Sequence, residues 1–298
     1  MPSIARREFL QKSLRWGAAA MAAGPLTALA ASGKLGSKMA FGMVTYQWGQ
    51  DWDLPTLIAN CAKTGIGGVE LRTTHAHKVE PSLTATERIE VKKRFADSPV
   101  TLVGIGSAEE FHHPDPARLA KAIEATKAFI KLSRDVGSSG VKVRPNDLPK
   151  NVPQEKTIEQ IGKALNVVGA FAADFGQQIR LEVHGACSPL PIIKRILDVA
   201  DHPNVAVCWN SNVTDLKGDG LVANFNSVKG RFGRTAHVRA LDSGDYPFPE
   251  LIRLFVEMDY QGWLLLEAGG KPKDPIRDLI HQRELFEKYV SHAQGKLG

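Results

Sequence analysis

The sequence predicts a (β/α)8 barrel, that is, a TIM barrel of eight parallel strands within an outer ring of helices. Eight short apolar runs each end beside a Gly, Pro, Asn or charged residue, and a helical pattern follows each run. Six of these runs carry charged or strongly polar residues at every second position near their C-terminal ends. A parallel strand that is buried on both faces is normally apolar throughout. The polar pairs therefore indicate one shared, chemically active interior, which is typical of a barrel with its site at the strand ends.

The eight predicted strands alternate with helical segments along the whole chain. They are Met39–Tyr46, Gly67–Thr73, Val100–Ser107, Gly140–Pro145, Ile179–Gly185, Val205–Asn210, Thr235–Asp242 and Trp263–Ala268. This alternation predicts parallel strands joined by right-handed crossovers, and eight units favour barrel closure over an open sheet. No G-x-G-x-x-G motif follows the first strand, which weakens the alternative of a dinucleotide-binding fold.

The predicted helices have recognisable starts and stops. The first three start at Asp53 with Pro55, at a capping box formed by Thr84 and Glu87, and at Asp115-Pro116. The fourth has the clearest apolar stripe: Ile158, Ile161, Leu165, Val168, Ala172 and Phe175. Gly176 follows as its C-terminal stop, and Pro275 marks the last helix. The sixth connection, from Val213 to Gly233, looks less helical than the others, and we expect a mobile segment over the site.

Residues 1–30 have the features of a twin-arginine signal peptide. Arg6-Arg7 opens the segment, an Ala-rich apolar stretch follows, and Ala28-Leu29-Ala30 resembles a cleavage site. Such a signal directs export of a folded protein to the periplasm. The alternative is a short amphipathic helix that packs on the barrel. Residues 38–298 are predicted to form a single barrel domain.

The charge of the remaining chain argues against a nucleic-acid partner. The whole chain carries +6, of which residues 1–30 contribute +3, so the remainder carries +6 − 3 = +3 with no basic run. The body of the protein has no membrane-spanning stretch. The three cysteines form no disulfide framework, although Cys187, after the fifth strand, is a candidate reactive thiol. The oligomeric state stays open, a homodimer included.

Alternation along the strands assigns the charged residues to the barrel axis. The aliphatic residues between them must face the helices, because that layer is continuous and dry. The polar residues then face inward: Glu70, Arg72, Lys142, Arg144, Glu182, His184, Asn210, Asn212, His237, Arg239 and Glu267. Buried charges must neutralise each other, hold a metal, or meet ligand at the barrel mouth.

Four of these side chains are the predicted metal ligands. Glu182, Asn210, His237 and Glu267 together suit a divalent ion such as Mn²⁺, Mg²⁺ or Zn²⁺. A metal there would grip adjacent oxygens of a sugar while a carboxylate removes a proton next to a carbonyl. The alternative is a structural ion-pair network of the glutamates with the neighbouring Lys and Arg residues.

These segments make the sequence similar to the xylose-isomerase-like family of barrels, which includes sugar isomerases, ketose 3-epimerases and inosose dehydratases. The resemblance runs from about Lys38 to the C-terminus and rests on residues 68–71, 180–184, 238–242 and 266–267. The family places metal-binding Glu, Asp, His and Glu on the fifth to eighth strands. Both Glu residues also serve as acid and base on opposite faces of the substrate. The resemblance implies these roles for Glu182 and Glu267.

Two strands depart from the family pattern. On the sixth, Asn210 stands where the family has Asp, and Val213 stands where it has a substrate-binding His. On the seventh, Arg239 replaces the family's metal-binding His, which leaves His237 as the available substitute on the same face. Metal binding therefore stays open at this point.

We expect a sugar isomerase, epimerase or lyase that acts on a small-molecule sugar. Glu182 would abstract a proton next to a sugar carbonyl, and Glu267 would return it or assist loss of a leaving group. The metal, or Lys142 with Arg144 and Arg239, would stabilise the oxyanion. The alternative is a catalytically weakened barrel that binds a carbohydrate or acidic ligand without turnover.

The remaining candidates surround this interior. The expected substrate-binding residues are Glu70, Arg72, Arg144, His184, Asn212, Arg239 and Trp48. Trp48 forms either an apolar wall for a sugar face or a seal over the barrel. His75 and His77 form either a metal-binding pair or solvated loop residues. The 109–113 loop, with its adjacent Glu and His residues, is more typical of ordinary surface.

Overall fold

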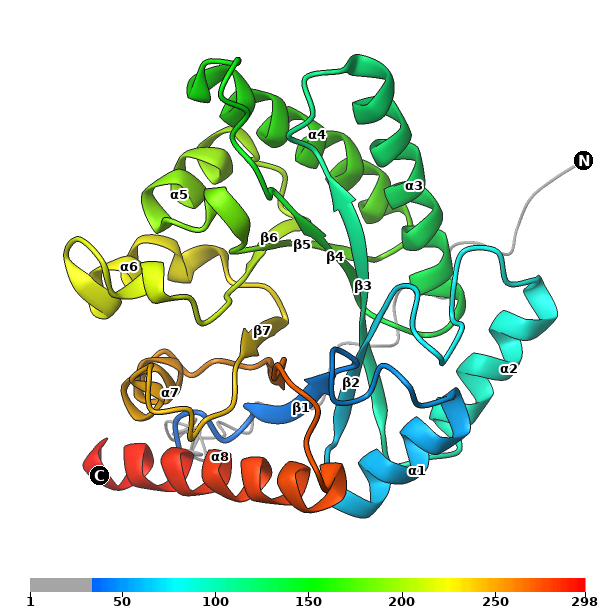
Figure 1. The fold of residues 1–298 in the computed structure, drawn as a ribbon, viewed down its shortest axis with the longest axis vertical. Coiled ribbons are helices and arrows are strands. Elements are labelled where there is room, and N and C mark those ends of the chain that lie inside the picture. Colours follow the sequence, from blue (N-terminus) through cyan, green and yellow to red (C-terminus); the bar gives the residue numbers. More distant parts are fainter. Residues whose placement is uncertain (1–33, 298) are drawn as a thin grey trace, which may run out of the picture. The chain divides into compact units, whose positions relative to one another are not determined.

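Eight parallel strands form the barrel wall in the computed structural model, which describes residues 34–297 (Figure 1). They are β1 (Ala40–Val44), β2 (Gly68–Arg72), β3 (Thr101–Glu110), β4 (Gly140–Arg144), β5 (Gln178–Glu182), β6 (Val205–Cys208), β7 (Thr235–Val238) and β8 (Trp263–Leu266). Consecutive strands pair in parallel from β1 to β6, β7 pairs with β8, and β8 pairs with β1. This arrangement confirms the predicted (β/α)8 barrel.

The junction between β6 and β7 is the weakest part of the wall. These two strands share only the isolated bridges Val207↔Phe232 and Asn210↔His237. Two backbone hydrogen bonds of 2.7 Å cross it, from the Gly233 amide to the Val207 carbonyl and from the His237 amide to the Trp209 carbonyl. The barrel is therefore nearly closed, and its seam passes between Asn210 and His237.

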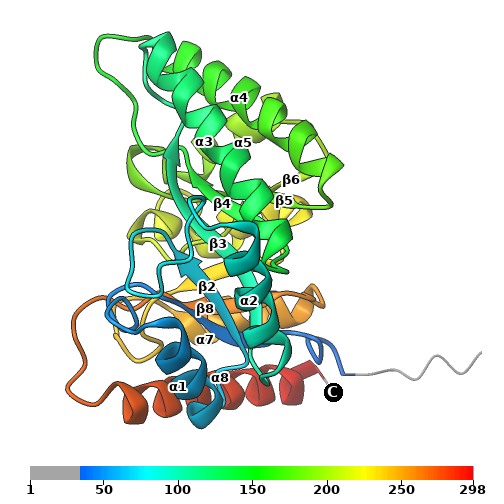
Figure 2. The ribbon, with the colours of Figure 1, turned by 90° about the vertical axis from the view of Figure 1, so that its right-hand side faces the viewer.

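A helix follows each strand and packs outside the wall (Figure 1 and Figure 2). The helices are α1 (Leu54–Thr64), α2 (Ala85–Ala96), α3 (Pro116–Asp135), α4 (Gln154–Asp174), α5 (Leu190–Val199), α6 (Gly220–Val228), α7 (Phe248–Glu257) and α8 (Pro275–Leu297). Short 3-10 helices lie at η1 (Gly185–Cys187), η2 (Val213–Leu216) and η3 (Lys229–Arg231). The sixth connection is therefore more helical than its glycines suggested. Within the described residues, no helix is long and apolar enough to cross a membrane.

The predicted helix starts are confirmed by their hydrogen bonds. The Asp53 carboxylate accepts from the Thr56 amide, and the Asp115 carboxylate accepts from the Ala117 amide. Thr84 and Glu87 form the reciprocal capping box of α2. The α4 stripe is buried as predicted, except that it ends at Ala172 because the helix itself stops before Phe175.

Most strands are shorter than predicted at their C-terminal ends. β7 ends at Val238 and β8 at Leu266, so Arg239 and Glu267 lie just beyond the last paired residue. These residues belong to the rim, where the chain turns away from the ladder. β3 is the exception, since it extends to Glu110 and brings that carboxylate to the rim.

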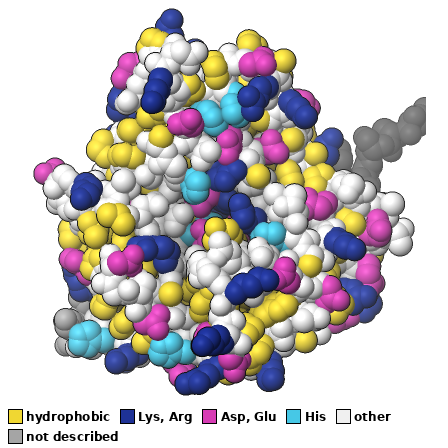
Figure 3. All heavy atoms as spheres, viewed as in Figure 1, with side chains coloured by type: hydrophobic (Ala, Val, Ile, Leu, Met, Phe, Trp, Pro, Cys, Tyr) yellow, Lys and Arg dark blue, Asp and Glu magenta, His cyan; other side chains and the backbone are white. Residues whose placement is uncertain are grey.

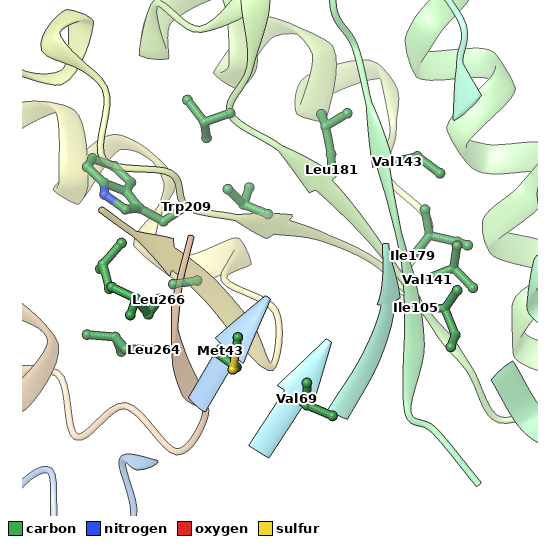
Figure 4. Close-up of a cluster of buried hydrophobic side chains, with 14 of the residues drawn as sticks. Met43, Val69, Ile105, Val141, Val143, Ile179, Leu181, Trp209, Leu264 and Leu266 are labelled. Atoms are coloured by element: carbon green, nitrogen blue, oxygen red, sulfur yellow. The ribbon is translucent and has the colours of Figure 1, made fainter. Parts of the chain in front are cut away.

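The two faces of the strands divide as alternation predicts. Val69, Val141, Val143 and Leu181 are buried in the hydrophobic layer between wall and helices (Figure 4). A separate small cluster of Val44, Val103 and Leu265, with Tyr46 and Trp263 packed against it, is also buried. Leu265 and Glu267 share one strand face, so this apolar cluster lies on the interior side, below the polar residues.

The predicted signal peptide, residues 1–30, lies outside the described residues. The described barrel begins with β1 at Ala40 and continues through α8.

Candidate active site

A cavity of about 410 Å³ opens at the C-terminal ends of the strands. Its lining comprises Tyr46, Arg72, Lys142, Arg144, Glu182, His184, Asn210, Ser211, Asn212, Val213, Arg239, Glu267 and Gly269. Charged and histidine side chains gather at the central hollow of this face (Figure 3). Residues from seven of the eight predicted strand ends therefore converge on one cavity, which is the position expected for the active site of such a barrel.

Glu182 and Lys142 form a buried ion pair at the base of the cavity. Lys142 Nζ lies 2.7 Å from Glu182 Oε2, and each side chain is only 2% exposed. Asn210 donates a hydrogen bond from Nδ2 to Glu182 Oε1 at 3.0 Å. Burial alone would raise the Glu182 pKa, but Lys142 and His237 outweigh burial and hold it well below its usual value. Glu182 is therefore ionised at neutral pH.

His237 links three carboxylates in the barrel interior. Its Nδ1 lies 3.3 Å from Glu267 Oε2 and 3.5 Å from Glu182 Oε1, while its Nε2 lies 3.2 Å from Glu70 Oε1. Burial alone would lower the His237 pKa, but Cys208, Glu267 and Glu70 raise it well above its usual value. The ring thus connects the two predicted acid–base residues to a third carboxylate below them.

Glu70 lies beneath the cavity rather than in its lining, and it is fully buried. Burial alone would raise the Glu70 pKa, but His237, Lys142 and Arg180 outweigh burial and lower it. Two glycines of β3 leave room for its carboxylate: a Cβ atom added at Gly104 would lie 2.8 Å from Oε2, and one at Gly106 would lie 2.9 Å from Oε1. Glu70 is therefore placed to orient His237 rather than to touch a ligand.

Arg180 is a buried interior cation that the sequence-based prediction missed. Its Nη1 donates to the Val103 carbonyl at 2.9 Å, and its Nη2 donates to Ser139 Oγ at 2.7 Å. With Lys142 and a protonated His237 it balances the three carboxylates of Glu70, Glu182 and Glu267. Its signal was present in the sequence, because Arg180 and Glu182 share the two-residue period of β5.

Two arginines at the rim are paired with carboxylates. Arg144 Nη2 lies 2.6 Å from Glu110 Oε1, and Arg239 Nη1 lies 2.5 Å from Asp245 Oδ2. The Arg239 backbone amide also donates to Ser211 Oγ across the seam at 3.0 Å. Both guanidinium groups thus line the cavity, and the charge of each is neutralised by its carboxylate partner.

Two other predicted substrate-binding residues also stabilise the rim. His184 Nδ1 lies 2.8 Å from Asn146 Oδ1. Asn212 donates from Nδ2 to the carbonyls of Val183 and Asn210. Both line the cavity, but these side-chain atoms are already engaged by loop partners.

Trp48 does not line the cavity. Its indole Nε1 donates to the Gly269 carbonyl at 3.3 Å, which ties the first loop to the eighth. Tyr46 instead provides the aromatic side chain of the lining, and Arg72 lies over its ring at 5.1 Å from the centroid. The sequence-based prediction missed Tyr46, although it shares a strand face with Val44.

His75 and His77 are engaged in loop structure, and their rings lie edge to face with centroids 6.1 Å apart. His75 Nδ1 lies 3.1 Å from Thr45 Oγ1, and His77 Nε2 lies 2.8 Å from the Arg72 carbonyl. Burial lowers the pKa of each to about 4. Cys187 is also buried, and burial raises its thiol pKa to about 12, so it is not a reactive thiolate.

Three of the four predicted metal ligands are arranged to hold a divalent ion. Glu182, His237 and Glu267 each offer a ligand atom, and these atoms lie within 4.8 Å of one another. His237 Nδ1 is buried without a hydrogen-bond partner among the described residues, and Glu70 on the opposite nitrogen matches the carboxylate–histidine pairs that orient metal ligands. Asn210 instead turns its amide nitrogen toward Glu182. A metal here would require His237 to lose its proton, because only neutral imidazole binds metal.

A family model, described as the xylose isomerase-like TIM barrel, matches residues 58–289. The chain belongs to this family. The match covers most of the barrel, including all the strands from β2 to β8. No curated protein matches the chain in sequence.

Several solved structures are similar to this one in fold. The 3-keto-D-glucoside 4-epimerase YcjR from E. coli has a TM-score of 0.69 and 15% identity, with 84% of this chain and 99% of that chain covered. An L-ribulose 3-epimerase has a TM-score of 0.74 and 16% identity, with 86% and 96% covered. The IolI protein with a bound zinc atom has a TM-score of 0.69 and 14% identity, with 85% and 98% covered. At such identities the likeness establishes the shared fold.

Proposed function

We propose that this xylose isomerase-like barrel is a sugar isomerase or epimerase that transfers a proton next to a sugar carbonyl. The observation that carries the proposal is the convergence of Glu182, Glu267 and Lys142 on one cavity of about 410 Å³. Two carboxylates can exchange a proton with a carbon acid, and an ammonium group can stabilise the enediolate that forms. The presence of epimerases among the similar structures supports this class of reaction.

The Lys142–Glu182 ion pair favours the first proton transfer electrostatically. Glu182 is held ionised by Lys142, so it is ready to accept a proton from the substrate carbon. When Glu182 becomes protonated, it no longer neutralises Lys142. The ammonium charge becomes available at the moment when negative charge develops on the carbonyl oxygen.

Glu267 is the second member of the acid–base pair. It reaches the cavity, its side chain is 15% exposed, and its only ion-pair contact in the described chain is with His237. In an epimerisation it would pass a proton from the protonated His237, whose Nδ1 lies 3.3 Å from Glu267 Oε2, to the intermediate. In the elimination version of the reaction, with a keto-glycoside as substrate, it would protonate the departing oxygen.

A divalent metal is part of the proposal because Glu182, His237 and Glu267 fit one. When bound, such an ion would polarise the carbonyl oxygen as a Lewis acid. Glu70 would hold the His237 ring in position through Nε2. The zinc atom bound by the similar IolI protein supports the inclusion of a metal.

Proton exchange with deuterated solvent tests the function directly. We expect the purified protein to incorporate deuterium into one or more members of a panel of keto-sugars and 3-keto-glycosides, as measured by NMR. Glu182→Gln and Glu267→Gln should each slow exchange by about 10²-fold or more. Glu90→Gln, an exposed ion-pair residue on α2, serves as the matched control. Sugar binding without exchange would favour the alternative of a binding protein, and release of an aglycone would identify the lyase.

We also propose that residues 1–30 direct export to the periplasm, as the twin-arginine pattern suggests. Cell fractionation of the native chain and of an Arg6→Lys/Arg7→Lys variant tests this. Periplasmic recovery should be lost in the variant, and equal recovery of both from the cytoplasm would contradict the proposal.

A further inference from the structure

Arg72 is the one cavity-lining cation without a carboxylate partner among the described residues. Four cations line the cavity: Arg72, Lys142, Arg144 and Arg239. Lys142 is paired with Glu182, Arg144 with Glu110, and Arg239 with Asp245. The guanidinium of Arg72 makes no ion pair or hydrogen bond within residues 34–297, and the cavity therefore presents one uncompensated positive charge.

The surroundings of Arg72 supply no anion to neutralise it. The nearest acidic residue in the following loop, Glu80, accepts from the Thr73 hydroxyl at 2.8 Å and from the Thr74 amide. His75, which lies beside Arg72, is neutral at physiological pH because burial lowers its pKa to about 4. The positive charge of Arg72 is therefore available to an anionic group of a ligand that enters the cavity.

The backbone of Arg72 is held by two hydrogen bonds, and its guanidinium contacts an aromatic ring. Its amide donates to Thr45 Oγ1 at 2.9 Å, and its carbonyl lies 2.8 Å from His77 Nε2. Its guanidinium lies over the Tyr46 ring, 5.1 Å from the centroid. The planar guanidinium fork matches carboxylate and phosphate geometry.

We propose that the natural substrate is an anionic sugar whose carboxylate or phosphate substituent is bound by Arg72, with the sugar ring beside Tyr46. This proposal rests on the proposed function, since it names the substrate class of the same cavity. The reacting carbon would lie at Glu182 and Glu267, and the anionic substituent would lie toward the β1 and β2 side of the cavity. Arg72 is then a specificity-determining residue, separate from the acid–base pair.

Equilibrium binding tests the proposal with unreactive probes. Isothermal titration at low salt compares D-glucuronate, D-glucose 6-phosphate and D-glucose. We expect at least one anionic sugar to bind the wild-type protein about 10-fold or more tightly than glucose, because a hydrogen bond to a charged group contributes that much. The tighter of the two anionic probes identifies the substituent as carboxylate or phosphate.

Variants of Arg72 attribute the preference to this residue. Arg72→Gln should abolish the preference, and Arg72→Lys should retain part of it, because the charge stays but the fork is lost. Arg94→Gln, an exposed arginine on α2, is the matched control and should bind like the wild type. Thermal unfolding of each variant checks that the barrel is intact.

The outcomes separate this inference from the proposed function. Equal or weaker binding of both anionic sugars relative to glucose, including no binding of any probe, would overturn the inference. So would an undiminished preference in Arg72→Gln. Because the readout is binding, an anion preference without proton exchange would defeat only the proposed function, and exchange on neutral keto-sugars without the preference would defeat only the inference.

Discussion

Lys142 Nζ lies 2.7 Å from Glu182 Oε2, and both groups are removed from water at the base of the cavity. The two residues come from the adjacent strands β4 and β5. Each charge is stable there because the opposite charge of its partner, together with the nearby Glu70 and His237, offsets the cost of burial. Stability and chemistry therefore depend on the same pair.

Lys142→Met should destabilise the protein by about 3–5 kcal/mol, because it leaves the Glu182 carboxylate buried without its partner. The double variant Lys142→Met/Glu182→Gln should be more stable than Lys142→Met alone, because it removes both charges. Urea unfolding of the three proteins measures the difference. A double variant that is less stable than the single one would show that the pair does not carry this coupling.

Added metal should stabilise the protein through Glu182, His237 and Glu267. After metal is stripped, titration with Mn²⁺ or Zn²⁺ should raise the melting temperature by several degrees, since binding to the folded state alone shifts the unfolding equilibrium. Glu267→Gln should reduce this shift, and Glu90→Gln should preserve it. An identical shift in both variants would place the metal elsewhere.

Asp215 should make stability fall as the pH rises. Burial raises its pKa from 3.8 to about 7, although Tyr246 donates to Oδ2 at 2.8 Å. The folded state therefore binds more protons than the unfolded state between these values. This contribution is fully present below about pH 4 and is lost as the pH passes 7.

Asp215→Asn should remove that part of the pH dependence. Unfolding free energies measured between pH 5 and pH 8 should decline by about 1–3 kcal/mol more in the wild type than in the variant. Parallel curves for the two proteins would mean that Asp215 ionises in the folded state as it does in the unfolded one.

Gly104→Ala should disturb the polar interior, because the new methyl group would lie 2.8 Å from Glu70 Oε2. We expect a loss of about 1–3 kcal/mol in unfolding free energy. Gly230→Ala is the matched control, since a Cβ there meets nothing within 4 Å. Equal stability of the two variants would show that the Glu70 carboxylate moves aside without cost.

The fold was predictable because strand alternation and helix caps are local signals. Lys142 and Glu182 each lie between aliphatic neighbours, so their direction follows from a two-residue period. The Asp53 and Thr84 caps likewise need only a few adjacent residues. These features fixed the barrel and most of the cavity lining.

The partners of each side chain depend on non-local geometry and were not predictable. Nothing in the sequence shows that Asn210 donates to Glu182, or that Glu110 neutralises Arg144. Tyr46, rather than Trp48, reaches the cavity because the chain leaves β1 at Val44 and the indole turns toward Gly269. Such details follow from loop paths, which periodicity does not describe.

The seam between β6 and β7 separates the active-site residues into two groups. Lys142, Glu182 and Asn210 stand on one side, and His237 and Glu267 stand on the other, with few backbone bonds across the gap. A substrate bound by both Glu182 and Glu267 would bridge this seam. A ligand held by both glutamates would therefore connect the two sides of the barrel where the wall has the fewest backbone hydrogen bonds.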